Sequence, residues 1–156
     1  MAIANHGRSR LSIAELTTLI NTHFPQVQEG NGRIAIEFLG AMSAHVRMAH
    51  DEGSLRPGGT VSGPAMFKLA DFTVYAAILG ECGADALEAV TTSMTINFLS
   101  RPEPADMVGK ARIIKLGRRL AVAEVEIYSE GKQDMVAHAT STFSLPPRQL
   151  PEGEVK

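Results

Sequence analysis

The 156-residue sequence has one cysteine and no tryptophan, and these shortages exclude several classes of protein. Cys82 alone cannot form an intrachain disulfide or a multi-cysteine metal site. Aromatic residues make up only 5% of the chain, which leaves little material for stacking single-stranded nucleic acid. The net charge is -2, with both signs spread along the chain, and this argues against a polyanionic partner. We therefore expect no nucleic-acid partner.

Long hydrophobic runs are also missing. No apolar run approaches the roughly 20 residues that a membrane-spanning helix needs, and residues 1–10 lack the apolar centre of a signal peptide. We expect a cytoplasmic protein that has no membrane partner. His45 and His50 are five residues apart and fall on opposite faces of a strand, and no phosphate-binding or dinucleotide-binding glycine motif is present. The sequence therefore predicts no metal and no organic cofactor.

The length and the hydrophobic content of 44% fit a single domain over residues 1–156. Apolar residues recur with a helical period from Leu11 to Ile20, and Ser12 and Glu15 have the spacing of a capping box. This pattern predicts an N-terminal helix over about 10–22. The prolines and polar residues of 146–156 predict a loose tail.

The stretch PAMFKLADFTVYAAIL, residues 64–79, has almost no polar side and predicts a helix that ends near 80–83. Two-residue alternation predicts a hairpin over 33–38 and 44–48 before this helix, and four strands over 87–99, 107–116, 120–128 and 135–145 after it. Short turns between such strands favour antiparallel pairing. An antiparallel sheet must cover its apolar face, and only this helix is apolar enough to do so. We expect an α+β fold whose sheet wraps around a long central helix.

An aspartate, Asp71, lies in the middle of this apolar helix. Burial of an unpaired ionised carboxylate is costly, so such a group normally shifts its pKa, finds a partner or serves a function. Two structural alternatives are that Asp71 faces solvent, or that it pairs with Lys68 three residues earlier.

The order of elements and several short motifs resemble the hotdog fold, and within it the acyl-CoA thioesterases of the phenylacetate-pathway type. The resemblance covers about 34–143. In that family an Asn is followed by His-Gly-Gly and by Leu-x-Asp on the central helix. The similar residues here are Gly59–Pro64, then Leu69-Ala70-Asp71, and later Thr95–Leu99 with Arg101-Pro102 and Leu116–Arg119. Asp71 follows Ser62 by nine residues, as the family's acid follows its His, while Arg56, Ser62 and Pro64 stand where the family has Asn, His and the second Gly.

Pro64 suits the first helical position, which would put Gly63 at the helix cap with an open N–H. An open N–H at the positive end of a helix would stabilise the oxyanion of a thioester, and the resemblance implies this role for Gly63. Asp71 lies eight residues further on, or about 12 Å along the helix, so one chain cannot bring both groups to one carbonyl. The pair therefore requires a two-fold dimer, and the resemblance implies a site at a dimer interface, often within a tetramer. Asp71 would either attack the carbonyl or activate a water molecule.

Four further residues are candidates for contact with coenzyme A, which would enter only as part of the substrate. Arg118 and Arg119 form a turn with two guanidinium groups that suit phosphate, and Arg56 lies at the family's Asn position. Asn97 matches a polar position of the family, although a strand asparagine can equally bind backbone. Ser62 could hold the leaving thiol or a water molecule, or simply form a turn.

The leading hypothesis is a homodimeric or homotetrameric thioesterase that hydrolyses small or medium acyl-CoAs. A first alternative is an acyl-CoA hydratase or dehydratase, although such hotdog relatives pair a His with the acid and Ser62 replaces that His. A second alternative is a non-catalytic acyl-CoA-binding protein, which the changes at Arg56, Ser62 and Pro64 would suit.

Overall fold

The computed structural model describes residues 10–147, so most of the predicted tail, residues 148–156, lies outside the described part of the chain. The chain forms one long helix, one short helix and a large sheet. The helices are α1 (Ile13–His23) and α2 (Gly63–Cys82), and three 3-10 turns are η1 (Pro25–Gln28), η2 (Glu52–Ser54) and η3 (Gly83–Ala86). The strands are β1 (Ile34–Gly40), β2 (Ser43–Met48), β3 (Leu55–Arg56), β4 (Thr60–Val61), β5 (Val90–Phe98), β6 (Met107–Leu116), β7 (Leu120–Ser129) and β8 (Met135–Ser144).

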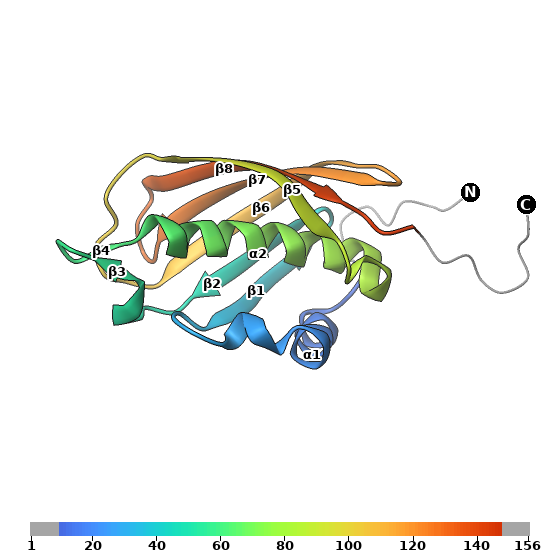
Figure 1. The fold of residues 1–156 in the computed structure, drawn as a ribbon, viewed down its shortest axis with the longest axis horizontal. Coiled ribbons are helices and arrows are strands. Elements are labelled where there is room, and N and C mark those ends of the chain that lie inside the picture. Colours follow the sequence, from blue (N-terminus) through green and yellow to red (C-terminus); the bar gives the residue numbers. More distant parts are fainter. Residues whose placement is uncertain (1–9, 148–156) are drawn as a thin grey trace, which may run out of the picture.

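Six strands form one antiparallel sheet in the order β1-β2-β6-β7-β8-β5, while β3 and β4 form a separate small ladder. Helix α2 crosses one face of the large sheet and contacts all six of its strands (Figure 1). Helix α1 lies beside α2 and β1. The predicted α+β hotdog architecture, in which an antiparallel sheet wraps around a long central helix, is therefore confirmed.

Helix α2 is buried on nearly every side along residues 72–80, which explains its all-round apolar sequence. The sheet can approach it closely because β6 carries Gly109 opposite Thr73. A Cβ atom at Gly109 would lie 2.5 Å from the Thr73 hydroxyl oxygen, so no larger residue fits without a shift. The buried Thr73 hydroxyl donates a hydrogen bond to the Leu69 carbonyl at 2.6 Å, which satisfies it within the helix.

The C-terminal end of α2 is tied to the β1–β2 turn. Met42 in this turn has a φ of 58°, a left-handed conformation that is unfavourable for a side chain of this size. Its backbone N–H donates a hydrogen bond to the Glu81 carboxylate at 2.6 Å. This contact fixes the hairpin against the helix across 39 positions of sequence.

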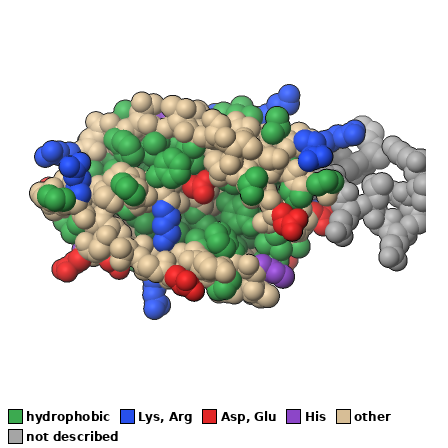
Figure 2. Space-filling model, viewed as in Figure 1, with side chains coloured by type: hydrophobic (Ala, Val, Ile, Leu, Met, Phe, Trp, Pro, Cys, Tyr) green, Lys and Arg blue, Asp and Glu red, His purple; other side chains and the backbone are tan. Residues whose placement is uncertain are grey.

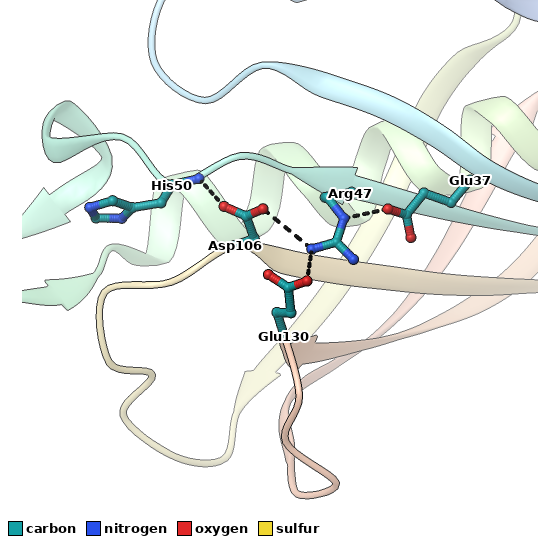
Figure 3. Close-up of polar contacts among 5 residues, drawn as sticks. All are labelled: Glu37, Arg47, His50, Asp106 and Glu130. Carbon is teal, nitrogen blue, oxygen red and sulfur yellow. Dashed lines mark hydrogen bonds and ion pairs between the residues drawn. The ribbon is translucent and has the colours of Figure 1, made fainter.

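An ion-pair cluster centred on Arg47 joins β1 and β2 to the segments beside β6 and β7 (Figure 3). The Arg47 guanidinium contacts Glu37, Asp106 at 3.3 Å and Glu130 at 2.8 Å. Asp106 also accepts a hydrogen bond from the His50 backbone N–H at 2.7 Å. The cluster fixes the chain where it leaves β2 for the loop that leads into α2.

Two features differ from the sequence-based expectation. The strand predicted over 87–99 begins only at Val90, because η3 and the following turn take up residues 83–89. The glycine-rich segment before α2 contains η2 and the β3–β4 ladder, where Gly58 and Gly59 adopt positive φ in the turn. Within residues 10–147, no helix is long and apolar enough to cross a membrane.

Candidate active site

The first turn of α2 places a free backbone N–H at Gly63. Ser62, not Gly63, is the N-cap, because its hydroxyl accepts a hydrogen bond from the Ala65 N–H at 3.3 Å and glycine has no side chain to do so. The prediction that Gly63 is the cap is thus wrong by one position. Gly63 is instead the first helical residue, and its N–H has no acceptor among residues 10–147.

The space beside Gly63 is narrow. A Cβ atom built on Gly63 would lie 3.3 Å from the Phe98 ring, which belongs to the end of the edge strand β5. Phe98 itself is 51% exposed, so this ring borders the helix N-terminus at the protein surface. A side chain at position 63 would therefore crowd the Phe98 ring at the start of the helix.

Asp71 lies two turns further along α2 and is half-buried. The Thr91 hydroxyl, from the start of β5, donates a hydrogen bond to Oδ1 of Asp71 at 2.5 Å. Lys68 does not pair with Asp71, since its ammonium group donates to the Asn31 carbonyl at 3.3 Å, and Asp71 forms no ion pair within residues 10–147. Oδ2 of Asp71 likewise has no partner among these residues, so one carboxylate oxygen is fixed and the other is available.

Asp71 opens onto a cavity of about 930 Å³, large enough for a small organic group. The cavity lies between α2, the end of α1 with η1, and the start of β5. Five of the eight aromatic residues of the chain line it, namely Phe24, Phe67, Phe72, Tyr75 and Phe143. Figure 2 shows hydrophobic side chains gathered on the face of the molecule that carries α2. Most of the few aromatic residues of the chain thus lie around one cavity, beside the Asp71 carboxylate.

Tyr75 is the most enclosed polar group of this cavity. Its hydroxyl donates a hydrogen bond to the Leu87 carbonyl at 2.7 Å, and burial raises its pKa above the ordinary value of 10.0. Tyr75 therefore stays protonated and serves as an apolar wall. No cluster of three or more potential metal ligands from His, Cys, Asp and Glu occurs in the described part of the chain.

None of the remaining predicted site residues lines this cavity. Ser62 caps α2, Arg56 is exposed in β3, and Asn97 is exposed in β5 opposite His138. Arg118 and Arg119 are exposed in the β6–β7 turn, and Arg119 donates to the Leu145 carbonyl at 3.2 Å.

Two groups of residues at the site are not predicted by the sequence. Thr91 carries no motif, and only the passage of β5 beside α2 brings it to Asp71. The aromatic residues follow ordinary core spacing in the sequence, so periodicity does not distinguish them from packing residues.

Comparison with known proteins shows the family of this chain. The family model of the thioesterase superfamily matches residues 58–136, which include Gly63, Asp71 and Thr91. A crystal structure from a Silicibacter species, provisionally named a thioesterase, is 42% identical, covers 90% of this chain and 95% of its own, and has a TM-score of 0.80. The chain belongs to the thioesterase superfamily, and this membership supports thioester hydrolysis as its general activity.

More distant relatives have related names. A phenylacetic acid degradation protein from Thermus thermophilus, solved as a mutant, is 27% identical over 72% of this chain and 93% of its own, with a TM-score of 0.63. A protein from Saccharolobus solfataricus, provisionally named an esterase, is 25% identical over 130 residues, 83% of this chain and 76% of its own. Mouse thioesterase superfamily member 2, at 20% identity and a TM-score of 0.72 over 87% of this chain and all of its own, shows the shared fold alone.

Proposed function

We propose that this protein is an acyl-CoA thioesterase that hydrolyses small or medium acyl-CoAs, with Asp71 as the reactive carboxylate. The observation that carries the proposal is the position of Asp71: a half-buried carboxylate in an apolar cavity, with Oδ1 held by Thr91 and Oδ2 available. A carboxylate so placed needs no metal and no separate cofactor, and coenzyme A enters only as part of the substrate.

The reaction has two routes that use the same group. As a general base, Asp71 takes a proton from water while the water oxygen attacks the thioester carbonyl carbon, and that proton passes to the leaving thiolate. As a nucleophile, Asp71 forms an acyl anhydride as the thiolate leaves, and water then hydrolyses the anhydride. Both routes break the C–S bond, form a C–O bond and yield a carboxylic acid and free coenzyme A.

The oxyanion needs a donor that lies close to Asp71, and Gly63 of the same chain is about 12 Å away along the helix. We therefore assign the donor to the Gly63 N–H of a second copy. Its position at the start of a 20-residue helix adds the positive end of the helix dipole to the N–H. Ser62 contributes as the cap that begins the helix there and leaves the Gly63 N–H free.

Strand β5 supports a homodimer of this kind. Within residues 10–147 it is an edge strand that pairs with β8 alone, and it exposes large apolar residues at both ends, Val90 at 58% and Phe98 at 51%. An edge strand presents unpaired backbone N–H and C=O groups that can pair with a strand of another chain. Antiparallel pairing of two β5 strands would set the two α2 helices side by side in opposite directions, as a two-fold axis requires. The site itself needs only a dimer, and a tetramer of two such dimers would keep it intact.

The phosphates of coenzyme A require cations at the surface rather than in the acyl cavity. Arg56, Arg118 and Arg119 are exposed, and guanidinium groups bind phosphate with two parallel hydrogen bonds. Asn97 is exposed in β5, one residue before Phe98, and its amide suits a polar contact to the coenzyme A arm. These assignments follow from exposure and chemistry, and they support the proposal of an acyl-CoA as the partner of the protein.

The test is the release of free thiol from acyl-CoAs of two to ten carbons and from phenylacetyl-CoA. Hydrolysis above the spontaneous rate by the purified protein supports the proposal. Loss of enoyl-CoA absorbance without thiol release would instead indicate a hydratase. Binding of acyl-CoAs by calorimetry with no turnover of any of them would indicate a non-catalytic binder.

A further inference from the structure

One wall of the cavity comes from the segment that joins α1 to η1. His23, Phe24, Gln26 and Val27 line the cavity from this side, opposite the α2 residues that include Asp71. The segment lies outside residues 58–136, the part of the chain that matches the thioesterase superfamily model. The match to the family model therefore does not extend to this wall.

The wall is held rigidly. The Gln28 side chain bonds both backbone groups of Ile34, donating to the carbonyl at 2.7 Å and accepting from the N–H at 3.0 Å, so η1 is fixed to the start of β1. The Phe24 N–H donates to the Ile20 carbonyl at 2.7 Å and closes α1. Ile20 is buried in the core, which anchors the helix behind the wall.

The aromatic rings of the wall and of α2 form a continuous surface. Phe24 meets Tyr75 edge to face at 6.1 Å between ring centroids, and Tyr75 stacks with Phe143 at 6.4 Å. Tyr75 is 8% exposed and fixed by its bond to Leu87, whereas the Phe24 ring is 39% exposed. Phe24 is thus the accessible ring of the wall, and Phe67 of α2, at 41%, is the other accessible ring of the cavity.

We propose that the segment 23–27, chiefly through Phe24, sets the size limit of the acyl group. This inference rests on the proposed function, because it takes the cavity as the acyl site. Tyr75 follows Asp71 by one helical turn, about 6 Å along the axis, and Phe24 lies against Tyr75. An acyl group with its carbonyl at Asp71 therefore meets the Phe24 wall after a compact apolar part, such as a six-membered ring or a short chain. Longer chains collide with the wall.

The test uses Phe24→Ala and the milder Phe24→Leu, with Phe38→Ala as a matched control. Phe38 is 44% exposed and does not line the cavity, and its ring contacts only the His45 ring among the rings of the described residues. Binding is measured by calorimetry with non-hydrolysable thioether analogues of acetyl-, hexanoyl- and decanoyl-CoA, and turnover with the matching thioesters. Phe24→Ala should raise the affinity for the decanoyl analogue, relative to that for the hexanoyl analogue, by about tenfold. Phe24→Leu should raise this ratio less, and the affinity for the acetyl analogue should stay within about twofold of the wild type in both variants.

The outcomes separate this inference from the proposed function. A shift in length preference with Phe24→Ala but not with Phe38→Ala supports the wall, even if no thiol is released and the proposed function fails. An unchanged preference in both Phe24 variants, each folded by circular dichroism, overturns the inference even if the protein is an active thioesterase. Equal shifts in Phe24→Ala and Phe38→Ala also overturn it.

Discussion

The Thr91 hydroxyl lies 2.5 Å from Oδ1 of Asp71 and donates a hydrogen bond to it, linking the start of the edge strand β5 to the middle of the central helix. The contact joins residues 20 positions apart. It holds one oxygen of the carboxylate of Asp71, a residue that lines the aromatic cavity. The position of the acid therefore depends on how β5 passes the helix, and not on the helix alone.

Thr91→Val should lower kcat about 10- to 100-fold with little change in fold, because valine keeps the shape of threonine and removes the donor to Asp71. Thr91→Ser keeps a hydroxyl and should retain activity within about threefold of the wild type. Steady-state kinetics on one acyl-CoA measures both. Equal losses in the two variants would show that the hydroxyl has no positioning role.

The two-chain site predicts complementation between inactive variants. Gly63→Val should be inactive because its side chain crowds the Phe98 ring and the approach to the oxyanion donor, and Asp71→Asn should be inactive because it removes the acid. Mixed dimers contain one site with an intact Gly63 and an intact Asp71. Because one of its two sites is intact, the purified mixed dimer should show about half of wild-type activity.

The two variants are mixed by co-expression with different affinity tags, and the doubly tagged dimer is assayed. A double variant, with both substitutions in one chain, serves as the control and should gain nothing from mixing with either single variant. Mixed dimers as inactive as their parents would contradict the assignment of donor and acid to different subunits.

The bond between Glu81 and the Met42 N–H predicts a local contribution to stability. Glu81→Ala should lower the free energy of unfolding by about 1–2 kcal/mol, because it leaves the N–H of a left-handed turn residue without its acceptor. Glu81→Gln keeps an oxygen acceptor and should lose less. Urea denaturation of both variants measures the difference, and an alanine variant as stable as the wild type would refute it.

Stability should also depend on pH through Glu124. A hydrogen bond from Arg112 at 2.5 Å, and a second from His138, lower the pKa of Glu124 below its ordinary value of 4.5. The pKa of Glu124 is thus lower in the folded protein than in the unfolded chain, so the unfolded chain binds the proton first as the pH falls. The stability that the charged Glu124 contributes is therefore present above pH 4.5 and is lost as the pH falls through the folded-state pKa.

The measurement for Glu124 is urea denaturation of the wild type and Glu124→Gln between about pH 5 and pH 3. The variant should lose less stability across this window, and Arg112→Ala should weaken the dependence in the same direction because it removes the main cause of the shift. Superimposable slopes for Glu124→Gln and the wild type would rule out this contribution.

Much of the fold was predictable because its signals are local. An apolar stretch over 64–79 predicts one buried helix, and the strands that follow alternate with a two-residue period over most of their length. The errors lie at element ends. Gly63 was expected as the cap, whereas Ser62 takes that position because only it has a hydroxyl for the Ala65 N–H. The strand expected from 87 was shortened by the 3-10 turn at residues 83–86.

The candidate site was predictable only in part. Asp71 was identified by its contrast with its neighbours and by family spacing, both of which are visible in the sequence. Thr91 and Phe24 lie 20 residues after and 47 residues before Asp71 and carry no motif, so their proximity depends on tertiary packing. Arg118 and Arg119 carry the charge that suits phosphate, and the roles proposed for them remain predictions.

The most direct measurement of the central claim is thiol release from a small or medium acyl-CoA by the wild type and by Asp71→Asn, with exposed Asp134→Asn as the matched control. The account predicts that the wild type and Asp134→Asn hydrolyse the thioester at similar rates, and that Asp71→Asn loses at least about 10²-fold in kcat while its Tm stays near that of the wild type. Asp71→Asn with full activity would contradict the assignment of Asp71 as the reactive carboxylate.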